Sequence, residues 1–312
     1  MTNTSIPARL GKDASLAAGA SGGGLRAGLI RYYSLTKPGV LYGNVITVVA
    51  GYFLASRGGF QAWPFLSLLV GSTLVIASAC VLNNVLDRDI DTAMARTRQR
   101  ATVTGNVRVR SAVTYSLVLG TLGLALLAAG TNWFVVAVGA GGFCVYVLLY
   151  GMLSKRMSVH GTLVGSVSGA APILGGYLAV SARLDLGAVL AFLALFLWQM
   201  PEFYSIAIYR RDEYARAGVP VISVVKGVAR TVRHILAYTV AFVVVTLLLA
   251  VFGYVGTVYT AVMSGLGLGW IGLGLAGFRA PDVTRWAHRM FGFSMVMILA
   301  LCLMFAIGPI LP

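Results

Sequence analysis

The residues best suited to chemistry lie in one short acidic segment, NNVLDRDID, at residues 83–91. Asn83, Asp87 and Asp91 are spaced i, i+4 and i+8, so on a helix they share one face, whereas Asp89 points elsewhere. Two carboxylates one turn apart at a membrane surface can hold Mg²⁺, which completes its coordination shell with water and substrate phosphates. The spacing therefore indicates a magnesium site for a phosphorylated substrate. The alternative is a set of solvated acids that end a membrane span and offset the nearby arginines.

The chain that carries this segment has the composition of a membrane protein. Of its 312 residues, 58% are hydrophobic and 11% are charged, whereas a soluble domain has about 25% charged residues. The mean hydropathy is +0.86. These values exclude a soluble enzyme, a disordered protein and a disulfide scaffold. The three cysteines lie far apart in apolar runs and show no metal-binding spacing.

Nine apolar stretches are long enough to cross a bilayer as helices, which takes about 20 residues each. They span residues 38–56, 64–86, 111–130, 134–153, 161–181, 186–209, 234–254, 257–278 and 291–311. All lack Lys, Arg, Asp and Glu, except that the sixth contains Glu202. Because irregular backbone cannot face lipid, the sequence predicts an all-α bundle of nine transmembrane helices.

The basic residues predict the orientation of these helices. The N-terminal tail and the loops on its side of the membrane hold 22 of the 24 Lys and Arg residues, and the opposite side holds only Arg57 and Arg183. Cytoplasmic loops carry such an excess, so the N-terminus is predicted to be cytoplasmic. The net charge of +15 reflects these loops, and no nucleic-acid partner is expected. The two long loops, 87–110 and 210–233, lie on the same side, which predicts a cytoplasmic functional face.

Residues 1–30 are rich in Gly, Ser and Ala and lack an apolar core, so they are not a cleavable secretory signal. We predict a disordered cytoplasmic tail over 1–30, followed by one membrane domain over 31–312. A short mitochondrial targeting segment is the alternative for the tail.

Longer segments of the sequence resemble a known family. The run NNVLDRDIDTAMARTRQRATVTGNV is similar to the first aspartate-rich box of the UbiA-type intramembrane prenyltransferases. Within that superfamily, three further segments most resemble the protohaem IX farnesyltransferases. They are SVHGTLVGSVSGAAPILGGY, WQMPEFYSIAIYRRDEYARAGVPVISVVKG and WAHRMFGFS. The resemblance runs from about residue 30 to the C-terminus.

The resemblance implies a helical bundle around a central cavity that opens to the cytoplasm and to lipid. It implies a Mg²⁺-dependent enzyme that transfers the farnesyl group of farnesyl diphosphate to a vinyl carbon of haem b. The expected location is a bacterial inner membrane. The expected downstream partners are haem A synthase or oxidase assembly proteins.

The resemblance also implies roles for residues near the aspartate box. Asp87 and Asp91 bind Mg²⁺, and Asn83 orients a carboxylate or binds a metal-bound water. Lys155 and Arg156 match a basic pair that clamps the diphosphate, although any Lys-Arg pair also satisfies the topology rule. Further arginines that compete for the same anions are Arg88 within the box and Arg96, Arg98 and Arg100 after it, of which Arg96 matches the family pattern best.

Other candidate site residues have both a functional and a purely structural interpretation. Arg210 and Arg211 suit haem propionates or are ordinary loop charges. Asp212 and Glu213 add a second metal contact or pair with these arginines. Tyr150, one turn from Tyr146, shelters a farnesyl cation or is an interfacial tyrosine.

Two more positions concern the haem. Of the three histidines, His160 is the best placed to approach haem, and an interfacial histidine is the alternative. Glu202 stands where the family usually has His after the WQxP proline. Glutamate is no ordinary iron ligand, but it can act as a base or hold a second cation.

Three other functions remain open. A prenyltransferase with an aromatic-acid, quinone-precursor or chlorophyllide acceptor predicts a strong DxxxD-like box in the second long loop, which is lacking here. A transporter predicts acids near the bilayer midplane, whereas these acids lie at one interface. A non-catalytic assembly factor leaves the aspartate box unexplained.

Overall fold

The structure, a computed structural model, describes residues 24–312 apart from the side chain of Arg156. The disordered tail was predicted over residues 1–30, and residues 1–23 of it lie outside the described part of the chain. Its last part is helical, because α2 spans Leu25–Leu35, so the prediction of disorder is wrong for residues 25–30. Leu35 and Tyr32 anchor α2 by packing against Val81 of the second span, and the Tyr32 ring lies 5.2 Å from that of Tyr115.

Within residues 24–312, nine helices are long and apolar enough to cross a membrane, as predicted. They are α3 (Pro38–Ser56), α4 (Ala62–Leu86), α6 (Val109–Gly130), α7 (Trp133–Cys144) continued by η1 (Val145–Ser154), α9 (Gly161–Ser181), α10 (Leu186–Tyr209), α13 (Val228–Val251), α14 (Thr257–Ala276) continued by η2 (Gly277–Arg279), and α15 (Val283–Ile307) continued by η3 (Gly308–Ile310). The helical bundle that the resemblance implies is thus present, and no strand occurs in this part of the chain.

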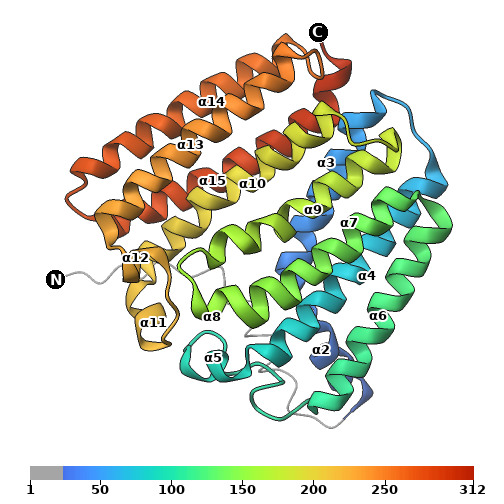
Figure 1. Ribbon diagram of the computed structural model, residues 1–312, viewed down its shortest axis with the longest axis vertical. Coiled ribbons are helices and arrows are strands. Elements are labelled where there is room, and N and C mark those ends of the chain that lie inside the picture. Colours follow the sequence, from blue (N-terminus) through green and yellow to red (C-terminus); the bar gives the residue numbers. More distant parts are fainter. Residues whose placement is uncertain (1–23) are drawn as a thin grey trace.

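Four short helices gather at one end of the bundle, in the lower part of Figure 1, whereas the C-terminus lies at the other end. They are α5 (Arg88–Ala93), α8 (Lys155–Met157), α11 (Arg211–Arg216) and α12 (Ile222–Val225). We call this the box end, because it carries residues 83–91. There the two long loops pack on each other, since Ile90 and Met94 form one apolar cluster with Val219, Tyr214 and Val221.

Glycines allow α3 and α9 (Gly161–Ser181) to cross closely. A Cβ atom on Gly176 of α9 would overlap the carbonyl oxygen of Val48 in α3, and one on Gly51 of α3 would overlap the carbonyl oxygen of Ile173. Small residues let membrane helices approach in this way. The crossing holds α3, and therefore the segment just before it, against α9, the fifth span.

The fourth span changes its winding near the box end. Its first part is α-helical, but residues Val145–Ser154 form a π-helix. The sequence predicted an ordinary helix here. Segments of π-helix are rare and often occur at functional sites, and this one carries both Tyr146 and Tyr150.

Candidate active site

The three polar residues of the aspartate box form one continuous, buried stack. The amide of Asp87 donates to the carbonyl of Asn83 (2.9 Å), and the amide of Asp91 donates to the carbonyl of Asp87 (2.8 Å), so the helical phase continues from α4 into α5. Asn83, Asp87 and Asp91 are only 2%, 2% and 3% exposed, whereas Asp89 is exposed. Their burial contradicts the alternative prediction that these acids are solvated. Two other parts of that alternative agree with the structure, since Asp87 ends α4 and Asp91 pairs with Arg100.

Each member of the stack is contacted by a cation from a different part of the chain. Lys37, between α2 and α3, donates from Nζ to Asn83 Oδ1. Lys155 Nζ lies 2.6 Å from Asp87 Oδ2, and Arg100 Nη1 lies 2.6 Å from Asp91 Oδ2. Two carboxylates therefore face three cations, and the cluster carries a net positive charge.

The stack retains a ligand atom for a divalent cation. Asp87 Oδ1 is buried and has no hydrogen-bond partner among the described residues. The amide Nδ2 of Asn83 is also unpartnered there, but it is a hydrogen-bond donor and suits a substrate oxygen or a metal-bound water. Within the described part of the chain, no group of three or more His, Cys, Asp or Glu side chains is arranged to hold a metal alone. Mg²⁺ commonly takes one or two carboxylates and completes its shell with water and substrate phosphates. The residues present fit that kind of site.

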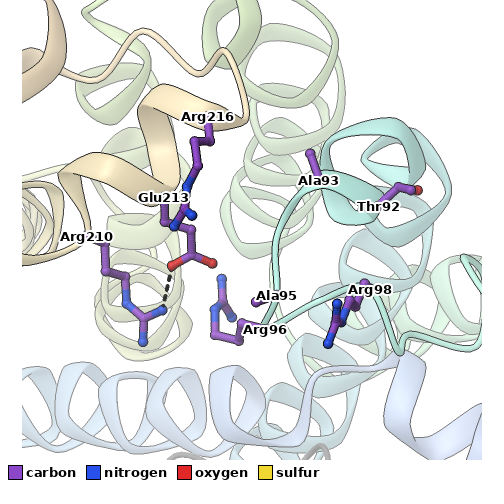
Figure 2. Close-up of a pocket in the computed structure, with 8 residues that line it drawn as sticks. All are labelled: Thr92, Ala93, Ala95, Arg96, Arg98, Arg210, Glu213 and Arg216. Carbon is purple, nitrogen blue, oxygen red and sulfur yellow. Dashed lines mark hydrogen bonds and ion pairs between the residues drawn. The ribbon is translucent and has the colours of Figure 1, made fainter.

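A second feature of the box end is a cavity of about 390 Å³ between the two long loops. Its charged lining residues are Arg96, Arg98, Arg210, Glu213 and Arg216. Figure 2 shows Arg96, Arg210 and Glu213 pointing toward one another, and Arg210 Nη1 lies 3.0 Å from Glu213 Oε2. Four guanidinium groups against one carboxylate make this cavity suited to an anion.

Tyr214 of α11 lies near the aspartate box, because it packs with Ile90 of α5 and with Met94. Burial raises the pKa of the Tyr214 phenol, and the charges of Arg96, Arg210 and Lys155 act on it in the opposite sense. Tyr150 also interacts with it. One side chain thus lies within electrostatic range of the cavity arginines and of the lysine that pairs with Asp87.

Aromatic rings lie beside the Asp87–Lys155 pair. The rings of Tyr146 and Tyr150 stack with centroids 5.7 Å apart, and Lys155 Nζ lies 5.9 Å from the Tyr150 centroid. Gly165 of α9 leaves room for this arrangement, since a Cβ atom there would lie 3.1 Å from the Tyr150 ring. A ring beside the aspartate box is where a substrate cation next to a diphosphate would be stabilised.

Other predicted site residues lie away from the buried stack. Arg88 is exposed and donates from Nε to the carbonyl of Thr102 (3.0 Å), which fixes the following loop. Arg211, Asp212 and His160 are exposed. Their roles stay predictions, as does that of Arg156, whose side chain lies outside the described part.

The structure gives contacts or burial for the two glutamates among the predicted site residues, Glu213 and Glu202. Glu213 pairs with Arg210, as one of its two interpretations predicted. Its Oε1 is buried and has no hydrogen-bond partner among the residues that the structure describes. Glu202 is half-buried inside α10, directly after Pro201. It precedes Tyr209 by two turns on the same helix face. Tyr209 in turn stacks on His288 of α15, with centroids 4.1 Å apart.

Sequence reasoning missed Lys37 and Tyr214. In the sequence, Lys37 is one of several basic residues before the first span, and it differs from the others only in directly preceding Pro38. In the structure it is half-buried, with backbone angles of φ 53° and ψ 69°, a left-handed conformation that costs a non-glycine residue about 1–3 kcal/mol. Burial, with a smaller contribution from Arg100, lowers the pKa of the Lys37 ammonium to about 8.

Comparison with known proteins gives this geometry its context. The model of the UbiA prenyltransferase family matches residues 44–304. "Protoheme IX farnesyltransferase" of Pseudomonas savastanoi pv. phaseolicola is 45% identical over 279 residues, covering 89% of this chain and 95% of the relative. "Protoheme IX farnesyltransferase 2" of Pseudomonas aeruginosa is 47% identical over 280 residues, covering 89% and 94%.

Solved structures agree on the fold. A digeranylgeranylglyceryl phosphate synthase superposes with a TM-score of 0.78 at 18% identity, covering 90% of this chain and 98% of that one. A UbiA homologue from Archaeoglobus fulgidus, bound to GPP and Mg²⁺, superposes with a TM-score of 0.65 at 16% identity, covering 88% and 99%. The nine-helix bundle, the buried aspartate box and the close relatives together place this chain in the UbiA prenyltransferase family, among the protoheme IX farnesyltransferases.

Proposed function

We propose that this protein transfers the farnesyl group of farnesyl diphosphate to a vinyl carbon of haem b, giving haem O. The allylic C–O bond breaks and its electrons leave with the diphosphate, while the vinyl π electrons form the new C–C bond. Water adds to the remaining cationic carbon and loses a proton. The names of relatives 45–47% identical to this chain support this reaction.

The observation that carries the proposal is the buried stack of Asn83, Asp87 and Asp91. These residues would hold Mg²⁺, which when bound neutralises charge that develops on the departing diphosphate. A family member solved with GPP and Mg²⁺ supports the pairing of metal and prenyl diphosphate. Lys155 lies against the same stack, so its ammonium is positioned to bind the diphosphate, and Arg156 follows it in the chain.

Tyr150 would stabilise the farnesyl cation after the C–O bond breaks. Its ring is next to Lys155 and stacks on Tyr146, so a cation formed beside the diphosphate meets an aromatic face. Such contacts contribute about 2 kcal/mol or more when they are desolvated. The same surroundings keep water from quenching the cation before the vinyl group attacks.

The cavity between the long loops would receive the propionates of haem b. Arg96 and Arg210 line it, and the packing of Ile90 and Met94 against Tyr214 and Val219, which brings the two long loops together, supports placing both substrate sites at this end of the bundle. Arg88, Arg211 and His160 remain further candidates for substrate contacts. Glu202 is proposed as a base or cation site, and Asp212 and Glu213 as a second metal contact.

The proposed location is a bacterial inner membrane, with the box end facing the cytoplasm. The excess of basic residues in the loops at that end supports this orientation. Farnesyl diphosphate is a charged molecule with an apolar tail, so a site at a membrane interface suits both parts. The product would pass to haem A synthase or to oxidase assembly proteins.

A product assay tests the proposal directly. The purified protein in nanodiscs is incubated with haem b, farnesyl diphosphate and Mg²⁺, and extracted haems are identified by chromatography and mass spectrometry. We expect a farnesylated, hydrated haem from the wild type and none from Asp87→Asn. A folded wild-type protein that gives no such haem, while a known haem farnesyltransferase does so in parallel, would refute the assignment of haem b as acceptor. Quinone-precursor and aromatic-acid acceptors would then be assayed in its place.

A further inference from the structure

His288 of α15 lies at the box end of the bundle, beside the last residue of α10. Its ring stacks on that of Tyr209, with centroids 4.1 Å apart and planes inclined by 20°, and Phe291 meets the same Tyr209 ring edge-on at 6.1 Å. Farther along these two helices, Trp198 Nε1 donates to the carbonyl of Ser294 (2.8 Å), which fixes α10 against α15. The imidazole of His288 therefore has a defined position and a defined plane.

One nitrogen of this imidazole is hydrogen-bonded and the other is available. His288 Nδ1 lies 2.9 Å from the carbonyl oxygen of Thr284. Because a carbonyl oxygen can only accept, Nδ1 carries the proton, and the neutral ring keeps a lone pair on Nε2. The residue is exposed, and Nε2 has no hydrogen-bond partner among the described residues. Histidines that bind metals usually have this arrangement, in which the second nitrogen donates to a carbonyl and so fixes the tautomer.

The other two histidines lack this arrangement. His160 is exposed at the start of α9, and its ring has neither a hydrogen bond nor a ring contact among the residues that the structure describes. His234 is half-buried between aromatic rings, with those of Tyr204 at 6.1 Å and Tyr238 at 6.4 Å. In the described part of the chain, His288 is thus the histidine with an oriented and accessible nitrogen lone pair.

Tyr209 also connects His288 to the cavity between the two long loops. The Arg210 guanidinium lies 5.8 Å from the centre of the Tyr209 ring, and the same Arg210 lines the cavity. A cation suited to a carboxylate and a lone pair suited to a metal therefore lie next to one tyrosine. A metalloporphyrin presents both partners, because it carries carboxylates on one edge and a Lewis-acidic metal at its centre.

We infer that His288 binds the iron of the haem substrate through Nε2, while Arg210 binds a propionate of the same haem. This inference rests on the proposed function. A flat, apolar ring that is bound only by its carboxylates can still tilt and slide, and an iron ligand fixes its centre. Neutral imidazole is a common axial ligand of haem iron. Coordination uses only the nitrogen lone pair and changes neither the vinyl group nor the oxidation state of the iron, so His288 positions the acceptor for prenyl transfer.

Resonance Raman spectroscopy of ferrous haem b, bound to the purified protein in nanodiscs, tests the inference without relying on turnover. An iron–histidine stretching band reports the ligand directly. We expect this band in the wild type and its loss in His288→Phe, which keeps a ring to stack on Tyr209. Added imidazole should restore nitrogen ligation in His288→Ala. Affinity for haem b should fall about tenfold in His288→Phe, whereas affinity for metal-free protoporphyrin IX should stay at the wild-type value.

His234→Leu is the matched control, because it removes a half-buried imidazole from the neighbouring α13 and should keep both the band and the affinity. Loss of the band in His160→Ala, with the band retained in His288→Phe, would assign the ligand to His160 and overturn the inference. Equal weakening of haem and metal-free porphyrin binding in His288→Phe would make His288 a structural residue and overturn it as well. Both results leave the proposed function intact. A folded wild type that binds no haem b would instead overturn haem b as the acceptor.

Discussion

Replacing Lys155 with methionine should have opposite effects on metal binding and on turnover. Lys155 pairs with Asp87 at 2.6 Å, and the side chains are 18% and 2% exposed. In the empty site its ammonium is the counter-charge of a buried carboxylate, so a divalent cation must compete with it. Lys155→Met removes that competitor and should strengthen metal binding in the absence of diphosphate. Turnover should fall, because the diphosphate loses a binding cation.

The size of the effect follows from the geometry of the pair. At 2.6 Å and an effective dielectric constant of about 20, the direct attraction is about 6 kcal/mol. Desolvation offsets most of it, and measured coupling energies of close charge pairs begin at about 1.5 kcal/mol. A net loss of about 2 kcal/mol for the unpaired Asp87 carboxylate, recovered when metal binds, corresponds to about 30-fold tighter metal binding.

Manganese binding followed by electron paramagnetic resonance, with Mg²⁺ as competitor, measures this affinity directly. Lys226→Met is the matched control, because Lys226 is an exposed lysine at the same end of the bundle and makes no contact with the box in the described structure. We expect tighter Mn²⁺ binding in Lys155→Met alone. Equal Mn²⁺ affinity in the two variants would refute the competition between Lys155 and the metal, even if turnover were lost.

Substitutions at four further positions probe separate parts of the protein. Asp91→Asn should lower haem product formation at least 100-fold while the melting temperature stays within a few degrees, since Arg100 can reach water; unchanged turnover would rule out Asp91 as a ligand. Tyr150→Phe should keep most activity and Tyr150→Leu should lose about tenfold, and equal rates for the two would exclude a cation–π role. Gly176→Ala should lower the free energy of unfolding by about 1–3 kcal/mol in thermal denaturation, and an unchanged melting temperature would contradict the α3–α9 contact. Glu202→Gln should lower turnover and Glu202→His should retain part of it under matched expression, whereas equal activity in both and in the wild type would make Glu202 a spectator.

The span pattern and the box were predictable because each depends on local sequence. A run of about 20 apolar residues specifies a membrane helix, and the spacing of Asn83, Asp87 and Asp91 specifies a shared face. Burial of the two aspartates did not follow from local spacing. It accompanies contacts from other parts of the chain, with Lys155 on Asp87 and Arg100 on Asp91, beside the second long loop, whose Val219 packs with Ile90 of α5.

The cation partners were harder to predict because they come from distant positions. Lys37 is 46 residues from Asn83, and Lys155 is 68 residues from Asp87. Such pairs form only after α3, α4 and the fourth span have packed. A lysine before a membrane span agrees with the excess of basic residues in cytoplasmic loops whichever way its side chain points. The position of Lys37 in the sequence therefore gave no sign of a role in the site. Lys155 was found through the family resemblance, which already contains that three-dimensional information.

The π-helical turn of the fourth span has a consequence for tolerance of changes in chain length. Elsewhere in the bundle, deleting one residue from a helix would rotate everything beyond it by about 100° and turn core residues toward lipid. Residues Val145–Ser154 are wound more widely than an α-helix. Loss of one exposed residue there, such as Leu148 or Leu149, would let the segment rewind as an α-helix without displacing Lys155 far. Single-residue insertions and deletions among homologues should therefore concentrate in this segment.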